Sequence, residues 1–158
     1  MQPNLPTLQS LLKRVEEADG PDKALAREIQ CKIGGWHRVT PSQRGGKHGA
    51  YIAPQDWIGR YSNGSPILDS LHGTEMHRDV PDITSSIEAG IALLKYVLPG
   101  ALWSVGFMEM GPFSQVIRPM PCGGYINGME TAKAATPPLA LCAAILRSLI
   151  SQQESADA

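Results

Sequence analysis

The run AATPPLALCAAILRSLI, at positions 134–150, constrains the fold of this chain more than any other feature. Thr136 can cap the N-terminus of a helix, and Pro137 fits the first helical turn, where its missing N–H leaves no hydrogen bond unmade. The apolar side chains that follow fall on one helical face: Leu139, Cys142, Ile145, Leu146 and Leu149. A helix this apolar has to pack against a sheet, so the chain must contain both helices and strands.

Two shorter helices are expected near the N-terminus. The first begins at Thr7 and ends at Gly20, and the second opens at Pro21 and ends at Gly34 and Gly35. Each carries one apolar stripe, formed by Leu8, Leu11, Leu12 and Val15 in the first helix and by Leu25, Ile29 and Ile33 in the second.

From Ser85 onward the pattern predicts a helix, three strands and a helix. Ser85 and Glu88 have the spacing of a capping box, and Pro99 ends the helix that they begin. The strands are expected at 103–107, 113–118 and 125–134, separated by turns that contain glycine. Connections this short favour an antiparallel meander.

Five residues in and beside the predicted strands are too apolar for the second face of the sheet to be fully solvated: Met108, Met110, Val116, Ile126 and Met129. We therefore expect an α+β fold, a three-layer α-β-α sandwich whose antiparallel sheet of at least three strands is covered by helices from both chain ends. A twofold partner is the alternative cover, which would make the chain a homodimer. The chain then forms one domain over 1–150, and the polar segment 151–158 is expected to be a disordered tail.

The segment 38–81 interrupts this regular pattern as an irregular insertion rich in Gly, Pro, Ser and Asn, with short strands expected at 50–53 and around Trp57. Whether it is ordered or disordered stays open. Its basic residues surround the pair Gly45-Gly46, so it is a candidate contact for phosphate or another anion. The candidate ligand-binding residues are Arg38, Arg44, Lys47, His48, Trp57 and Tyr61.

The end of the insertion holds the densest group of metal-ligating residue types, His72, Glu75, His77 and Asp79. Imidazole and carboxylate groups bind zinc and similar ions when they converge at fixed geometry. A solvated surface segment is the competing interpretation, because the spacing matches no helix-borne metal motif.

Three blocks resemble the recurring segments of the phage ABA-sandwich domain family: LLKRVEEADGPDKALAREI, PDITSSIEAGIALL and AATPPLALCAAILRSL. They occur in the family's order, and Trp36 after the second helix also fits. The resemblance implies a three-layer helix-sheet-helix domain of phage or prophage origin whose activity is not generally assigned. The segment 38–81 is longer than the resemblance implies, and it is where an individual function would reside.

The order helix, three strands, helix is also that of a double-stranded RNA-binding domain. Such domains hold phosphates with clustered Lys and Arg near the start of the last helix, where this chain has Thr136 and two prolines. Between 81 and 150, four basic residues balance four acidic ones, and the whole chain has a formal net charge of -1. The charge pattern therefore argues against nucleic acid as a partner.

The sequence predicts neither a secretory signal nor a membrane span, and the odd, widely spaced cysteines fit the reducing cytoplasm of a bacterial host. No catalytic motif or cofactor fingerprint is recognisable, so the balance leans against an enzyme and no cofactor is expected. The leading hypothesis is a non-enzymatic accessory protein that blocks a host protein or sequesters a small anionic ligand. The alternatives are a metal-dependent hydrolase that uses His72 and His77, and an RNA-binding module.

Overall fold

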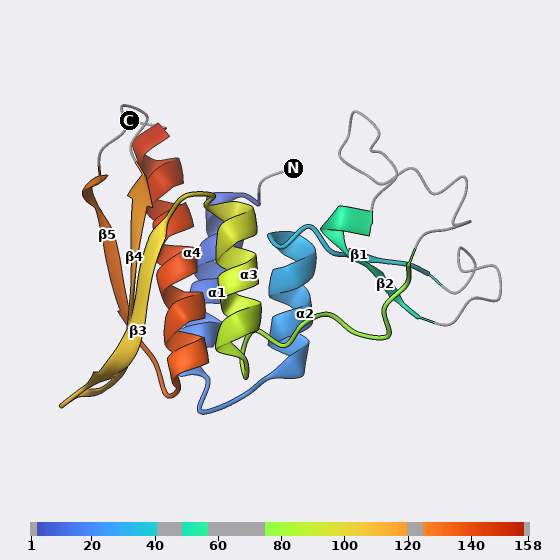
Figure 1. The fold of residues 1–158 in the computed structure, drawn as a ribbon, viewed down its shortest axis with the longest axis horizontal. Coiled ribbons are helices and arrows are strands. Elements are labelled where there is room, and N and C mark those ends of the chain that lie inside the picture. Colours follow the sequence, from blue (N-terminus) through green and yellow to red (C-terminus); the bar gives the residue numbers. More distant parts are fainter. Residues whose placement is uncertain (1–2, 41–48, 57–74, 120–124, 157–158) are drawn as a thin grey trace.

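The computed structural model describes residues 3–40, 49–56, 75–119 and 125–156. It has an α+β fold with the predicted helix, three-strand, helix order in its second half (Figure 1). Within the described ranges, no helix is both long and apolar enough to cross a membrane. In chain order the elements are α1 (Leu5–Glu17), α2 (Lys23–Lys32), β1 (His37–Arg38), β2 (Tyr51–Ile52), the 3-10 helix η1 (Pro54–Asp56), α3 (Ile87–Val97), β3 (Leu102–Met108), β4 (Gly111–Pro119), β5 (Tyr125–Lys133) and α4 (Pro137–Ala156).

The three long strands form an antiparallel sheet in the order β3-β4-β5, which confirms the predicted meander. Ser114 and Val116 of β4 and Ala132 of β5 are fully buried on the face that meets the helices. The register places Trp103 beside Val116 and Val105 beside Ser114, so these β3 side chains project to the same face.

Helix α4 lies between the main sheet and the other helices that pack on it (Figure 1). It packs on β4 and β5 on one side and on α1 and α3 on the other (Figure 1). Every residue from Leu139 to Leu146 is at most 1% exposed, as expected for a helix that is apolar all round. Helices α3 and α4 approach each other closely at Gly90 of α3, where an added Cβ would lie 2.8 Å from the side chain of Leu141.

The three-layer sandwich is not confirmed, because the helices lie on one side of the sheet (Figure 1). The N-terminal helix α1 packs on the back of α4, whose surface is apolar on both sides, and does not cover the second face of the sheet. That outer face carries the cross-strand row Leu102, Ile117 and Met129, of which Leu102 and Met129 are about half exposed. Val116, which the sequence suggested for the outer face, points to the helices instead.

Helix starts differ by one or two residues from those expected, and capping explains each shift. Helix α1 begins at Leu5 and not at Thr7, because the Asn4 side chain accepts the N–H of Thr7. In α2 the cap is Asp22, and in α3 the cap is Ser86 and not Ser85. The N–H of Leu139 donates to the Thr136 hydroxyl at 3.4 Å, so the predicted start of α4 is confirmed.

Most of the segment 151–158, expected to be a disordered tail, is helical, since α4 continues to Ala156. The Gln153 amide donates to the carbonyl of Pro3 at 2.6 Å, and Arg118 donates to the Ser151 hydroxyl at 3.1 Å. These contacts tie the last helical turns to the N-terminus and to β4, which composition alone did not indicate.

A second, smaller sheet lies on the far side of α2 from the main sheet (Figure 1). Strands β1 and β2 pair antiparallel, and His77 forms an isolated antiparallel bridge with Tyr51. The predicted short strand at 50–53 is thus confirmed as β2, whereas the stretch around Trp57 lies outside the described residues. The described parts of the insertion therefore lie outside the main sheet and form a separate small sheet with β1.

Candidate metal centre

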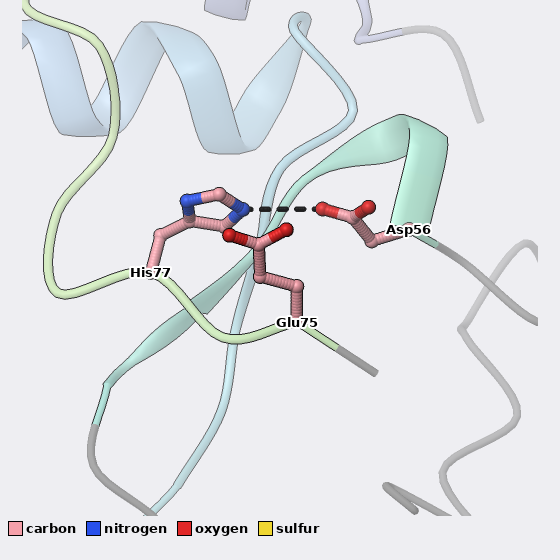
Figure 2. A group of neighbouring side chains, drawn as sticks. All are labelled: Asp56, Glu75 and His77. Atoms are coloured by element: carbon pink, nitrogen blue, oxygen red, sulfur yellow. Dashed lines mark hydrogen bonds and ion pairs between the residues drawn. The ribbon is translucent and has the colours of Figure 1, made fainter. Parts of the chain in front are cut away.

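Three side chains converge at the small sheet: Asp56, Glu75 and His77 (Figure 2). One ligand atom of each lies within 4.8 Å of the other two. His77 Nε2 and Asp56 Oδ2 form a hydrogen bond at 3.1 Å (Figure 2). The cluster thus combines one imidazole nitrogen with two carboxylates.

His77 is positioned by backbone hydrogen bonds to β2. Its N–H donates to the carbonyl of Tyr51 at 2.8 Å, and its own carbonyl accepts the N–H groups of Ala50 and Tyr51 at 2.8 and 3.1 Å. Because side chains alternate along an extended segment, Glu75 projects to the same side as His77. The bridge with β2 therefore places both residues at once.

Asp56 is the last residue of η1, the turn that follows β2, and its side chain points toward His77 (Figure 2). Its N–H donates to the carbonyl of Ala53 at 3.0 Å, which closes the turn directly after β2. Tyr51, Ile52 and Ala53 are buried and anchor that strand. The cluster thus depends on β2 twice, because β2 pairs with His77 and leads directly into the turn that ends at Asp56. In the sequence, 20 residues lie between Asp56 and His77.

The indole ring of Trp36 meets the imidazole of His77 edge to face, with ring centroids 5.2 Å apart and an interplanar angle of 74°. Trp36 itself is held where α2 ends, because its N–H donates to the carbonyl of Gln30 at 3.1 Å. The chain turns there at Gly35, whose φ of +73° suits glycine. The indole restricts the plane in which His77 can present its nitrogen.

The geometry suits a small divalent cation. Two ligands of one ion, each bonded at about 2.1 Å, lie about 3.0–3.4 Å apart, which matches the His77–Asp56 distance. Those two side chains are 30% and 22% exposed, while Glu75 is exposed, so the cluster opens to solvent on one side. Three protein ligands with a mixed nitrogen and oxygen set leave coordination positions for water or a ligand.

Asp79, one of the four metal ligands proposed from the sequence, lies outside this cluster and binds Arg27. The guanidinium donates to both carboxylate oxygens, at 2.8 and 2.6 Å. The hydrogen bond from Arg27 holds the pKa of Asp79 below its usual value. Asp79 thus helps to fasten the small sheet to α2, and His72 lies outside the described residues.

Of the six candidate ligand-binding residues, Arg38 is described, while Arg44, Lys47, His48, Trp57 and Tyr61 lie outside the described residues. Arg38 pairs with Tyr51, and Tyr51 also pairs with His77, so the three form one cross-strand row. Opposed residues of antiparallel strands project to the same face. The row therefore puts a cation on the face that carries His77.

Sequence reasoning found Glu75 and His77 but missed Asp56. An aspartate at the end of a 3-10 turn has no motif that links it to a histidine across the insertion. The one sequence feature that points to Asp56 is the short strand predicted at 50–53, because this strand leads into the turn that ends at Asp56.

The two described thiols do not contribute to this chemistry. Burial raises the pKa of Cys142 to about 12, and its Sγ donates to the carbonyl of Ile83 at 3.2 Å. Burial also raises the pKa of Cys31, with a smaller opposing effect from Arg38. Both thiols therefore stay protonated at neutral pH.

No family model matches this chain, and neither a curated protein nor a solved structure is significantly similar to it.

Proposed function

We propose that this protein binds a divalent transition-metal ion through Asp56, Glu75 and His77, and that the ion holds a small anionic ligand. The convergence of one imidazole and two carboxylates on a scaffold fixed by β2 carries the proposal. Three ligands leave the ion with open positions, and anionic oxygens fill such positions readily. Arg38, in the same cross-strand row as His77, supplies further positive charge.

This proposal gives a physical basis to one branch of the leading sequence hypothesis, the sequestering of an anionic ligand. The phage or prophage origin, the host cytoplasm as the place of action, and an outer layer over the sheet remain part of the proposal. They rest on the ABA-sandwich resemblance and on the exposed apolar residues of the outer face.

Metal titration by calorimetry, with elemental analysis of the loaded protein, tests the metal site. Asp56→Asn and His77→Gln keep the size of the side chain but remove a ligand charge or the imidazole nitrogen. We expect one equivalent of zinc or manganese on the unmodified protein and affinity weaker by at least about 100-fold in either variant, since loss of outer-shell partners alone costs 10–100-fold. Glu109→Gln, which removes an exposed carboxylate in the β3–β4 turn, is the matched control and should bind normally.

Equal affinity in His77→Gln and the unmodified protein would contradict the site. Binding should also weaken as the pH is lowered, because the imidazole nitrogen binds metal only when it is unprotonated. The anion is tested separately, by titrating inorganic phosphate into the zinc-loaded protein and into its Arg38→Gln variant. We expect phosphate to bind only when metal is present, and more weakly without Arg38.

A metal-dependent hydrolase is the second candidate, favoured by the exposure of Glu75. In this alternative, Asp56 and His77 would hold the ion, and the exposed Glu75 carboxylate would act as a general base beside it and not as a third ligand. Metal-loaded protein would then cleave an activated phosphate ester such as bis(p-nitrophenyl) phosphate, and Glu75→Gln would lose turnover more than it loses metal. Absence of turnover with zinc, manganese and cobalt would leave the binding function alone.

A further inference from the structure

Strand β3 forms an edge of the main sheet (Figure 1). Within the described residues it pairs with β4 alone, in unbroken register from Leu102 to Met108, so its other edge presents free backbone groups. Proteins usually guard such an edge with a charge, a proline or a bulge, and β3 has none of these.

Four large apolar side chains are exposed along this edge: Leu102 at 48%, Trp103 at 42%, Phe107 at 74% and Met108 at 57%. Helix α4 packs chiefly on β4 and β5, which explains why Trp103 and Phe107, on the helix side of β3, are left exposed. The exposed residues thus lie on both faces of one strand, at its edge. A second strand laid beside β3 would cover both sets together.

The order of these residues is self-complementary. When two copies of β3 are aligned antiparallel about Val105, Leu102 faces Met108 and Trp103 faces Phe107. Both residues of each pair are exposed, and both project to the same face of the sheet. Ser104 then faces Gly106, so that only small residues meet on either side of Val105 at the middle of the contact.

We propose that the protein forms a twofold dimer in which β3 of one copy pairs antiparallel with β3 of the other. The contact places the Trp103 ring of each copy against Phe107 of its partner, an aromatic pair of the kind that stabilises sheets. The strand carries no charged residue, so two identical copies bring no like charges opposite each other. The result is one continuous sheet with both helical bodies on the same side.

The area available is sufficient for a specific contact. Taking about 200 Å² for a fully exposed large side chain, the four residues offer roughly 440 Å² per copy. Two copies therefore bury roughly 900 Å² before the strand backbones are counted, near the ~1,000 Å² expected of a biological interface. A twofold axis is also the commonest symmetry of soluble oligomers.

Light scattering after size exclusion tests the proposal on the full chain. We expect twice the monomer mass of 17.0 kDa for the unmodified protein and for Met129→Lys, which alters a residue that is 53% exposed on the outer face of β5. Phe107→Lys should give the monomer mass with an unchanged circular dichroism spectrum, since Phe107 is mostly exposed.

A monomer at about 50 μM for the unmodified protein, above the micromolar range of a weak dimer, would overturn the proposal. A dimer that survives Phe107→Lys would also overturn the proposal. A dimer that is lost in Met129→Lys would overturn it as well and would place the contact on the outer face. If Phe107→Lys does not fold, Val105→Cys provides the second measurement, because two copies aligned about residue 105 bring these thiols together. Oxidation should then cross-link the Val105→Cys dimer but not a Thr131→Cys control, and equal cross-linking would contradict the alignment.

Discussion

The helical body and the small sheet that carries the Asp56–Glu75–His77 cluster are held together by different interactions. In the body, α1, α2, α3 and α4 share one apolar core with the buried face of the main sheet. The small sheet has strands of two residues and relies on backbone hydrogen bonds around Tyr51 and His77. Its buried apolar residues, Val39, Tyr51, Ile52, Ala53 and Val80, are not members of the main core. The main apolar core and the candidate ligand cluster thus lie in separate parts of the chain.

Helix α2 joins the two regions. One of its faces contributes Leu25 and Ile29 to the main core. Another face holds the small sheet, through Arg27 bound to Asp79 and through Gln30, whose carbonyl accepts the N–H of Trp36. The Asp56–Glu75–His77 cluster is thus supported by the body without sharing its core.

The largest effect is expected in the body. Leu141→Ala removes a fully buried side chain from the contact between α4 and α3, and should lower the free energy of unfolding by about 3 kcal/mol. Urea denaturation followed by circular dichroism measures it. Leu102→Ala, on the exposed edge strand, is the control and should cost less than about 1 kcal/mol in the monomer. Equal losses in the two variants would break the distinction between core and surface.

A smaller loss is expected where the two regions join. Gly35→Ala places a side chain at φ +73°, with its Cβ 2.3 Å from the hydroxyl of Tyr96, and should destabilise the protein by about 1–3 kcal/mol. Gly20→Ala is the matched control, because no atom lies within 4 Å of the added Cβ. Thermal unfolding compares the two. A neutral Gly35→Ala would mean that this turn does not constrain the junction.

The contact between Trp36 and His77 should affect the metal site more than the fold. Trp36→Leu removes the ring that restricts the imidazole plane, and should weaken zinc binding by about 10-fold, the lower range for partners that orient a ligand. Calorimetry measures this, with Trp103→Leu on the main sheet as control. Unchanged affinity in Trp36→Leu would remove the indole from the site.

The smallest effect concerns the ion pair between Arg27 and Asp79, both more than a third exposed. Asp79→Asn should cost less than about 1 kcal/mol at neutral pH, because solvent screens such pairs. The folded pKa of Asp79 is lowered, so its contribution is present above the unfolded value of about 3.9 and is lost as the pH falls through the folded pKa. Urea midpoints from neutral to acidic pH should therefore converge for variant and unmodified protein, and a constant difference would contradict this.

Much of the fold could be predicted because periodicity reports burial. The strands and α4 follow the apolar pattern closely, and the core residues Leu8, Leu11, Leu25 and Ile29 were identified from their spacing. The side of the sheet on which α1 lies could not be predicted, because an apolar stripe does not specify its partner. The outer face of the sheet, which was predicted to be covered by helices, is exposed, because α1 packs on the apolar surface of α4 instead.

The candidate ligand cluster was only partly predictable for a related reason. Glu75 and His77 alternate along one extended segment, so sequence brings them to one side. Asp56 joins them through the pairing of Tyr51 with His77, a long-range bridge that local pattern does not encode. Asp79 has the right chemistry but lies beside Arg27, a partner contributed by α2.

The central claim is that a divalent ion binds at the small sheet and leaves the helical body unchanged. Paramagnetic line broadening by substoichiometric manganese tests it directly on the full chain. Amide signals of residues 50–56 and 75–77 should broaden first, while those of residues 139–146 in α4 stay sharp. Broadening spread evenly over the exposed carboxylates, or absent at residues 75–77, would contradict the account.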